Sequence, residues 1–237
     1  MSEAEPVPTL AAASPRPGRL IVIEGGDGAG RSSQVRLLLP WLEEQGWAPV
    51  HAGLGRSDLA RRALRKHRRT PEAGVRSLAL LYAADLADQG ARRVQPALHA
   101  GFIVVADRWV ATARARCLVR GADPLWLAHV LPVEPAPDLT IHLHATPERR
   151  LEREIAKRGL PEFSECGRDL GLDPDPLKSF VRYQGLLDAR YEEMGRATGA
   201  ALWRTLGAEA DVGQVQAALR QVVGAHLGSM SGASAGG

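Results

Sequence analysis

The stretch RLIVIEGGDGAGRSSQVRLLLPWL, residues 19–42, decides the fold of this chain. It opens with a short apolar run, turns through several glycines and continues with apolar residues at helical spacing. Its middle fits the template G-x-x-x-x-G-K-[ST] at every fixed position except the lysine, which is Arg31. Glycines let backbone N–H groups curl around a phosphate, and the helix N-terminus adds partial positive charge. The pattern therefore predicts a phosphate-binding strand–loop–helix unit.

Arg31 is the unusual residue of this loop. It keeps the positive charge of a lysine, but it is bulkier and binds two oxygens at fixed angles. Two interpretations stay open: a working substitution in an arginine-rich protein, or a nucleotide-binding protein with weak chemistry. Ser32 carries a hydroxyl that can bind Mg²⁺. The expected phosphate-binding residues are Gly25, Gly26, Asp27, Gly28, Ala29, Gly30, Arg31, Ser32 and Ser33.

The rest of the chain alternates short apolar runs with longer amphipathic segments, and no internal repeat interrupts this pattern. Near-continuous apolar strands alternating with helices predict an α/β fold, a doubly wound parallel sheet covered by helices on both faces. The expected strands are 20–23, 49–52, 102–106, 139–143 and 201–203, and the expected helices are near 32–45, 59–67, 72–100, 147–158, 176–197 and 212–226.

The composition indicates a globular protein that is suited to binding anionic ligands. The 237 residues suit one domain, and the chain is 45% hydrophobic and 24% charged. Of its 30 basic residues three are Lys and 27 are Arg, and arginine forks suit phosphate. The net charge of +3 is too small to indicate nucleic acid, so we expect no nucleic-acid partner.

Segment boundaries follow from the same composition. Residues 1–18 and 228–237 are rich in small residues and predict disordered ends around a domain of residues 19–227. Residues 159–176, the lid segment, break the strand–helix rhythm and indicate a mobile binding loop or an inert insertion. The chain lacks a signal-peptide pattern and an apolar stretch long enough for a membrane, so we expect a cytoplasmic protein without a membrane partner. Cys117 and Cys166 are expected to be free thiols.

A second acidic element follows the expected strand at 102–106 and reads Asp107-Arg108-Trp109. In a parallel sheet, ligands bind at the carboxyl ends of the strands. Asp107 is therefore a candidate Mg²⁺ ligand through water, together with Ser32, and Arg108 a candidate contact for an acceptor phosphate. A surface ion pair is the alternative interpretation of these residues.

Four motifs in register resemble the thymidylate kinases, which are nucleoside monophosphate kinases of the phosphate-loop class. The resemblance covers residues 19–225. It rests on IVIEGGDGAGRSSQ at 21–34, LALLYAADLADQ at 78–89, GFIVVADRWVATARA at 101–115 and PDLTIHLHATPERRLER at 137–153.

The resemblance implies transfer of the ATP γ-phosphoryl group to a deoxynucleoside monophosphate, dTMP in the family, with Mg²⁺. Asp27 matches an acid that reaches toward the acceptor nucleotide, and Arg56 and Arg108 match arginines that grip its phosphate. Tyr82 stands where the family has a ring that stacks on thymine, and it is also an ordinary residue for a helix core. The family further implies a homodimer packed through helices such as 72–100.

The basic residues before the lid segment are also candidates. At helical spacing Arg149, Arg153 and Lys157 share one face, which is typical of a solvated helix face and also suits screening of transferring phosphate charge. Of the basic residues Arg149, Arg150, Arg153, Lys157 and Arg158 we expect at most one or two, with Arg153 as the candidate, to reach the phosphates beside Asp27, Arg31 and Arg108.

Departures from the family cluster around the base. The arginine that contacts thymine in the family is Leu86 here, and the usual polar residues after Arg108 become the run 110–117, which ends in Cys117. His144 replaces a usual Asp, and with His142 it is interpreted as a structural pair rather than a metal site. We therefore expect these departures to weaken the selection of thymine more than the binding of phosphate. A silent nucleotide-binding homologue and a kinase for another monophosphate remain alternatives.

Overall fold

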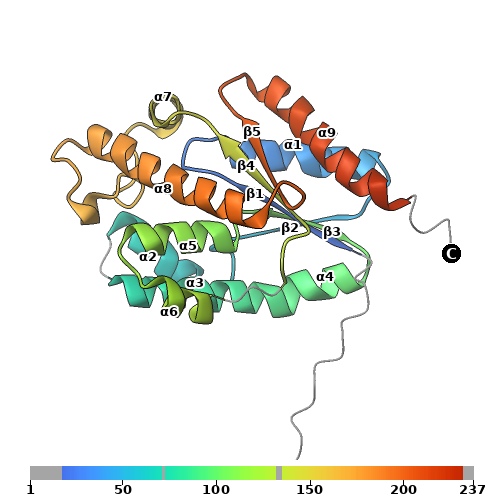
Figure 1. The fold of residues 1–237 in the computed structure, drawn as a ribbon, viewed down its shortest axis with the longest axis horizontal. Helices are drawn as coiled ribbons and strands as arrows, with labels where there is room; N and C mark the ends of the chain where they lie inside the picture. The colour runs from blue at the N-terminus through green and yellow to red at the C-terminus, as the bar shows by residue number, and fades with distance from the viewer. Residues whose placement is uncertain (1–17, 71–72, 132–134, 232–237) are drawn as a thin grey trace, which may run out of the picture.

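The protein is seen in a computed structural model that describes residues 18–70, 73–131 and 135–231. In these residues a single sheet has the strand order β2-β3-β1-β4-β5, with every neighbouring pair parallel. Helices cover both of its faces (Figure 1), so the doubly wound α/β prediction is confirmed. The strands are β1 Arg19–Glu24, β2 Pro49–Gly53, β3 Ile103–Asp107, β4 Leu139–His144 and β5 Trp203–Gly207.

The central strand β1 separates two hydrophobic cores by simple alternation. Leu20 and Val22 point into one core, and Ile21 and Ile23 point into the other. All four side chains are at most 1% exposed, which explains why a parallel strand covered on both faces reads as a continuous apolar run.

The helices divide between the two faces of the sheet. Helices α1 and α9 pack on the face of Ile21, while α3, α4 and α5 pack on the face of Leu20 (Figure 1). The bounds are α1 Arg31–Glu44, α2 Arg61–Arg69, α3 Val75–Gln89, α4 Gln95–His99, α5 Val110–Val119, α6 Pro124–Val130, α7 Pro147–Arg158, α8 Pro176–Thr198 and α9 Val212–Ser231.

Two helix starts were readable from capping chemistry. The side chain of Thr146 accepts from the N–H of Arg149 at the start of α7, and that of Asp175 accepts from Leu177 at the start of α8. In each case a proline follows the cap, where its missing N–H costs nothing. The predicted starts at residues 147 and 176 are confirmed.

Strand β5 corrects one sequence prediction. The apolar stretch 201–203 predicts a strand, but the strand runs from Trp203 to Gly207. At this edge of the sheet β5 pairs only with β4, so most of its side chains are exposed and no apolar run marks it.

Helices α5 and α6 were missed by the sequence analysis. Helix α5 lies between two layers: Ala113 and Cys117 face the core that contains α3, and Ala111 and Ala115 face α8. Small residues buried on both sides leave no amphipathic stripe to detect. Helix α6 has only seven residues, too few for a helical period.

The long helix expected at 72–100 is interrupted. A π-helical segment, Gly90–Val94, joins α3 to α4, and residues 71–72 lie outside the described part of the chain. At the C-terminus α9 continues to Ser231, four residues past the boundary at 227, which stays a prediction. The predicted disorder of residues 1–17 and 232–237 concerns positions outside the described residues.

The strand register places the glycine-rich loop, which contains Asp27, next to the Asp107-Arg108 element. Ile23 at the end of β1 pairs with Asp107 at the end of β3, and Gly53 at the end of β2 pairs with the same residue. Three connections therefore leave the sheet side by side at the carboxyl ends of its strands: the glycine-rich loop after β1, the loop after β2 and the segment after β3.

We expect the two leucines at the middle of α1 to differ sharply in their contribution to stability. Leu38 is fully buried between the sheet and α9, whereas its neighbour Leu37 is 40% exposed. Leu38→Ala should lower the free energy of unfolding by about 2–5 kcal/mol because it leaves a cavity. Leu37→Ala should change it by no more than about 0.5 kcal/mol. Chemical denaturation of both variants checks this, and equal losses would contradict the packing described.

Candidate active site

A cleft of about 1010 Å³ opens at the carboxyl ends of β1, β2 and β3. It is bounded by the glycine-rich loop, by α2 and α3 on one side and by α7 on the other. The predicted residues Asp27, Arg56, Tyr82, Arg108 and Arg153 all line it, together with the loop residues from Gly28 to Ser33.

At two positions the glycine-rich loop requires glycine, because a side chain there would overlap atoms of Arg150. Gly28 has a φ of +82°, and a Cβ there would overlap the carbonyl oxygen of Arg150. A Cβ at Gly26 would overlap the guanidinium of Arg150. Helix α7 therefore packs directly against the backbone of the loop, and this close approach is possible only without side chains.

Arg31 folds back onto the loop that precedes it. Its Nη1 donates to the carbonyl oxygen of Gly25 at 2.7 Å and also to that of Gly26, and its Nε donates to Oδ1 of Asp107 at 3.2 Å. The guanidinium thus closes the loop and ties it to β3. Burial, followed by the charge of Arg108, lowers the pKa of Arg31 from its ordinary value.

Ser32 and Asp107, the two predicted magnesium ligands, lie next to each other. The Ser32 hydroxyl donates to Oδ2 of Asp107 at 2.6 Å. Burial would raise the pKa of Asp107, but Arg31 and the Ser32 hydroxyl lower it, so the carboxylate is ionised. Among the described residues, no group of three or more Asp, Glu, His or Cys side chains is placed to hold a metal ion. A carboxylate–hydroxyl pair fits Mg²⁺, which usually takes few protein ligands besides water and substrate phosphates.

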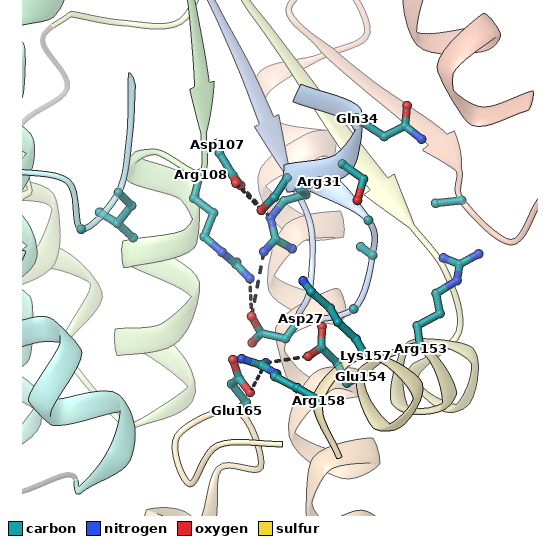
Figure 2. Close-up of a pocket in the computed structure, with 18 of the residues that line it drawn as sticks. Asp27, Arg31, Gln34, Asp107, Arg108, Arg153, Glu154, Lys157, Arg158 and Glu165 are labelled. Atoms are coloured by element: carbon teal, nitrogen blue, oxygen red, sulfur yellow. Dashed lines mark hydrogen bonds and ion pairs between the residues drawn. The ribbon is translucent and has the colours of Figure 1, made fainter. Parts of the chain in front are cut away.

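Asp27 stands at the centre of an ion cluster. Its carboxylate lies 2.5 Å from Nη2 of Arg108, 3.3 Å from Nη2 of Arg116 and 3.9 Å from Nη2 of Arg31. Figure 2 shows the guanidinium groups of Arg31 and Arg108 side by side, both directed at this carboxylate. Burial would raise the pKa of Asp27, but the three guanidinium groups, that of Arg108 most of all, hold it far below its usual range.

The backbone at Arg108 is strained. Arg108 has a φ of +67°, the only positive value at a non-glycine residue in the described ranges. Its N–H donates to the carbonyl oxygen of Ile23, and its own carbonyl accepts from the N–H of Leu54. The side chain then donates to Gly25 at 2.9 Å and to Thr112 at 3.2 Å. A conformation held by contacts on every side is typical of functional positions.

Helix α5 is aligned by a buried carboxylate that the sequence did not single out. Glu24, at the end of β1, accepts from the N–H of Trp109 at 2.9 Å, and its other oxygen accepts from the Thr112 hydroxyl at 2.5 Å. Desolvation raises its pKa although these donors act against the shift. The contact joins β1 to the segment that carries Arg108 and Arg116.

Gln184 of α8 was also missed, since nothing near it in the sequence marks it. Its Oε1 accepts from the N–H of Asp27 at 2.9 Å, and its Nε2 donates to the Glu165 carbonyl of the lid segment at 3.0 Å. Arg150, 1% exposed and ion-paired with Asp188, donates to the same Oε1 at 3.3 Å. One amide therefore couples the glycine-rich loop to the lid segment.

The loop that carries Arg56 is held by Asp85 of α3. The Asp85 carboxylate accepts from the N–H of Gly55 at 2.6 Å and from that of Ser57 at 2.9 Å. Arg56 itself is exposed and faces the cleft. The arrangement leaves its guanidinium open to a ligand.

Tyr82 lies beside Arg116, whose Nη1 donates to the tyrosine hydroxyl at 3.3 Å. The two residues that replace family polar groups point elsewhere: Leu86 is 1% exposed and Cys117 fully buried, both in the core. Burial raises the pKa of the Cys117 thiol to about 12. Both cysteines are free, as predicted.

The basic residues of α7 separate into two groups. Arg153 donates to the carbonyl oxygens of Glu209 and Ala210, and Figure 2 shows it directed away from Asp27. Arg158 lies on the other side, ion-paired with Glu154 and with Glu165 of the lid segment at 2.6 Å. Arg149 and Lys157 line the cleft as well. The structure thus does not bring Arg153 together with the Asp27 cluster.

His142 and His144 alternate on β4 as predicted. His142 is 1% exposed and stacks on Tyr191 at 4.8 Å between ring centroids, and burial lowers its pKa to about 3. The structural interpretation of this pair agrees with the packing of His142 against His144, Tyr191 and Trp203.

Comparison with known proteins decides the family of this chain. A model of the thymidylate kinase family matches residues 23–169. The chain is also 31% identical over 217 residues to a probable thymidylate kinase 2 from Saccharolobus solfataricus, covering 89% of this chain and 97% of that protein. This chain belongs to the thymidylate kinase family.

Other members of the thymidylate kinase family match shorter parts. A thymidylate kinase from Clavibacter sepedonicus is 42% identical over 53% of this chain and 63% of its own length. A probable thymidylate kinase from Pyrococcus abyssi is 33% identical over 62% of this chain and 75% of its own length. The family places the fold among the phosphate-loop nucleoside monophosphate kinases, as the resemblance implied. Within the described ranges, every helix is too short or too polar to cross a membrane.

Asp27→Asn should destabilise this thymidylate kinase family member strongly at neutral pH. The change leaves buried guanidinium groups without their anion, which costs about 3–5 kcal/mol. Because the folded pKa of Asp27 lies below the unfolded value of about 3.9, this stability is present above that pH and is lost as the pH falls further.

The measurement is the free energy of unfolding of wild type and variant between pH 7 and pH 3. The difference between them should shrink at the acid end. Asp58→Asn is the control, because Asp58 is 90% exposed in its pair with Arg61 and its loss should cost no more than about 0.5 kcal/mol. A difference that stays constant with pH would contradict the ionic role of Asp27.

Proposed function

We propose that this protein transfers the γ-phosphoryl group of ATP to dTMP and forms ADP and dTDP. The observation that supports it most is the meeting of two phosphate-binding arrangements in one cleft. The closed glycine-rich loop with Ser32 suits the ATP phosphates, and Arg108 at the neighbouring strand end suits an acceptor phosphate. The names of its relatives agree with this assignment.

The chemistry asks mainly for positioning and for neutralisation of charge. An oxygen of the acceptor phosphate attacks the γ-phosphorus, the bond to the β–γ bridging oxygen breaks, and ADP leaves with the electron pair. Backbone N–H groups of the loop and Arg31 hold the donor phosphates, and Arg56 and Arg108 hold the acceptor phosphate in line. Ser32 and Asp107 would hold Mg²⁺, which would supply further neutralisation of the charge on the donor phosphates.

The Asp27 cluster keeps the acceptor-side arginines in place before substrate arrives. Asp27 orients Arg108 and Arg116 while Asp85 orients the loop of Arg56. Prior orientation lowers the reorganisation needed at the moment of transfer. The lid segment, connected to Asp27 through Gln184, closes one side of the same cleft.

A nucleotide-binding protein without turnover is the second candidate. It is favoured by the contacts of Arg31, whose guanidinium is bound to carbonyl oxygens of its own loop instead of facing the cleft alone. In this case ATP would bind and no acceptor would be phosphorylated.

The test of the proposed function is ADP release from ATP and Mg²⁺ with a panel of deoxy- and ribonucleoside monophosphates. We expect turnover with dTMP well above the background of ATP alone. Turnover only with another monophosphate would show that this monophosphate, and not dTMP, is the acceptor. No turnover, with ATP binding retained in calorimetry, would support the second candidate.

Arg31→Ala should lower kcat by about 10²–10³-fold, because it removes the positive charge that closes the glycine-rich loop, where the donor phosphates would bind. The fold should remain, which circular dichroism checks. Arg31→Lys is the matched control: it keeps the charge and should retain turnover within about tenfold of wild type. Unchanged turnover in Arg31→Ala would contradict the role of Arg31, and a large rise in Arg31→Lys would mark a weakened enzyme.

A further inference from the structure

Tyr82 of α3 and Arg116 of α5 form a wall at the acceptor side of the cleft. Both line the cleft itself and also a recess of about 10 Å³ behind it. The recess has room for about one water molecule, so a planar ring that enters the cleft stops against these two side chains. They are therefore the groups that meet the far end of an acceptor nucleotide.

This wall consists of hydrogen-bond donors. The Arg116 guanidinium has five N–H donors and no acceptor, and only part of it is used by Tyr82 and Asp27. The Tyr82 hydroxyl accepts from Arg116, which leaves its own proton free to donate. A ligand group that complements the wall must bring acceptor atoms, such as the carbonyl oxygens of a base.

Arg116 is also fixed in position. Its side chain is 13% exposed and is held at one end by Asp27. Helix α5, which carries it, is anchored by the contacts of Glu24 with Trp109 and Thr112. A rigid donor group penalises a partner that offers another donor, because neither hydrogen can then be satisfied.

The opposite helix provides no substitute for it. Leu86 lies one turn after Tyr82 on α3 and packs into the core, so its position presents no polar atom to the cleft. Asp27, for its part, already has a shorter contact with Arg108 than with Arg116. Asp27 thus has a second guanidinium partner, and Arg116, which lines the cleft, keeps N–H donors that Asp27 and Tyr82 do not use.

We propose that Arg116, together with the Tyr82 hydroxyl, is a specificity-determining residue that selects bases rich in carbonyl oxygens over bases that carry an amino group. Thymine has a carbonyl on both sides of its ring N–H, whereas cytosine replaces one of them with an amino group. This inference rests on the proposed function, since it assigns the base end of that acceptor site. A guanidinium matched to base acceptors discriminates by about 10–100-fold.

The experiment measures equilibrium binding of dTMP and dCMP by calorimetry, and kcat/KM for both with ATP and Mg²⁺. Wild type should favour dTMP by at least about tenfold. Arg116→Gln should reduce this ratio by about tenfold, mainly through weaker dTMP binding and a higher KM. Arg116→Lys keeps donors and charge, so it should retain most of the preference. Arg114→Gln on the same helix, which lines neither cavity, is the control and should behave as wild type.

One result would overturn the inference: a dTMP-to-dCMP ratio that Arg116→Gln leaves unchanged. An equal loss for both nucleotides is one form of this result and marks a purely structural role. If wild type binds dTMP selectively through Arg116 but releases no ADP, the proposed function fails and the inference stands. If Arg116→Gln does not fold in thermal unfolding, Tyr82→Phe tests the same wall. It keeps the ring and removes the hydroxyl, and it should lower the ratio measurably, while an unchanged ratio would reject the role of the wall.

Discussion

The ion cluster around Asp27 is the interaction on which the rest of the site depends. One buried carboxylate neutralises guanidinium groups from three places: Arg31 at the start of α1, Arg108 after β3 and Arg116 on α5. Without it, like charges would be buried side by side, which is far more costly than leaving them in water. The carboxylate thereby fixes the start of α1, the segment after β3 and helix α5 relative to one another around the cleft.

The same residue also connects the cleft to its cover. The backbone N–H of Asp27 is bound to Gln184, whose amide reaches the carbonyl of Glu165 in the lid segment. Arg150 packs against the glycines of the loop and donates to that amide from behind. The glycine-rich loop, the lid segment and α8 are thus parts of one hydrogen-bonded assembly.

Much of the fold could be predicted because it follows local rules. The apolar runs of β1 and β3 and the caps of α7 and α8 are properties of neighbouring residues. The prediction failed where burial is unusual for the element. Strand β5 lies at an edge and carries exposed side chains, and α5 is buried on both sides by small residues. Neither gives the pattern expected of its class.

The sequence by itself determined the glycine-rich loop after β1 and the Asp107-Arg108 element, because each is a motif of adjacent residues, and the family resemblance added Arg56 and Tyr82, which line the same cleft. Only the tertiary structure decided which charges pair. It brought Arg116 to Asp27 and Tyr82, turned Arg153 toward residues 209–210 and set Gln184 against the loop. Such pairs join residues up to 157 positions apart, and their geometry follows from helix packing and strand register, which no local pattern encodes.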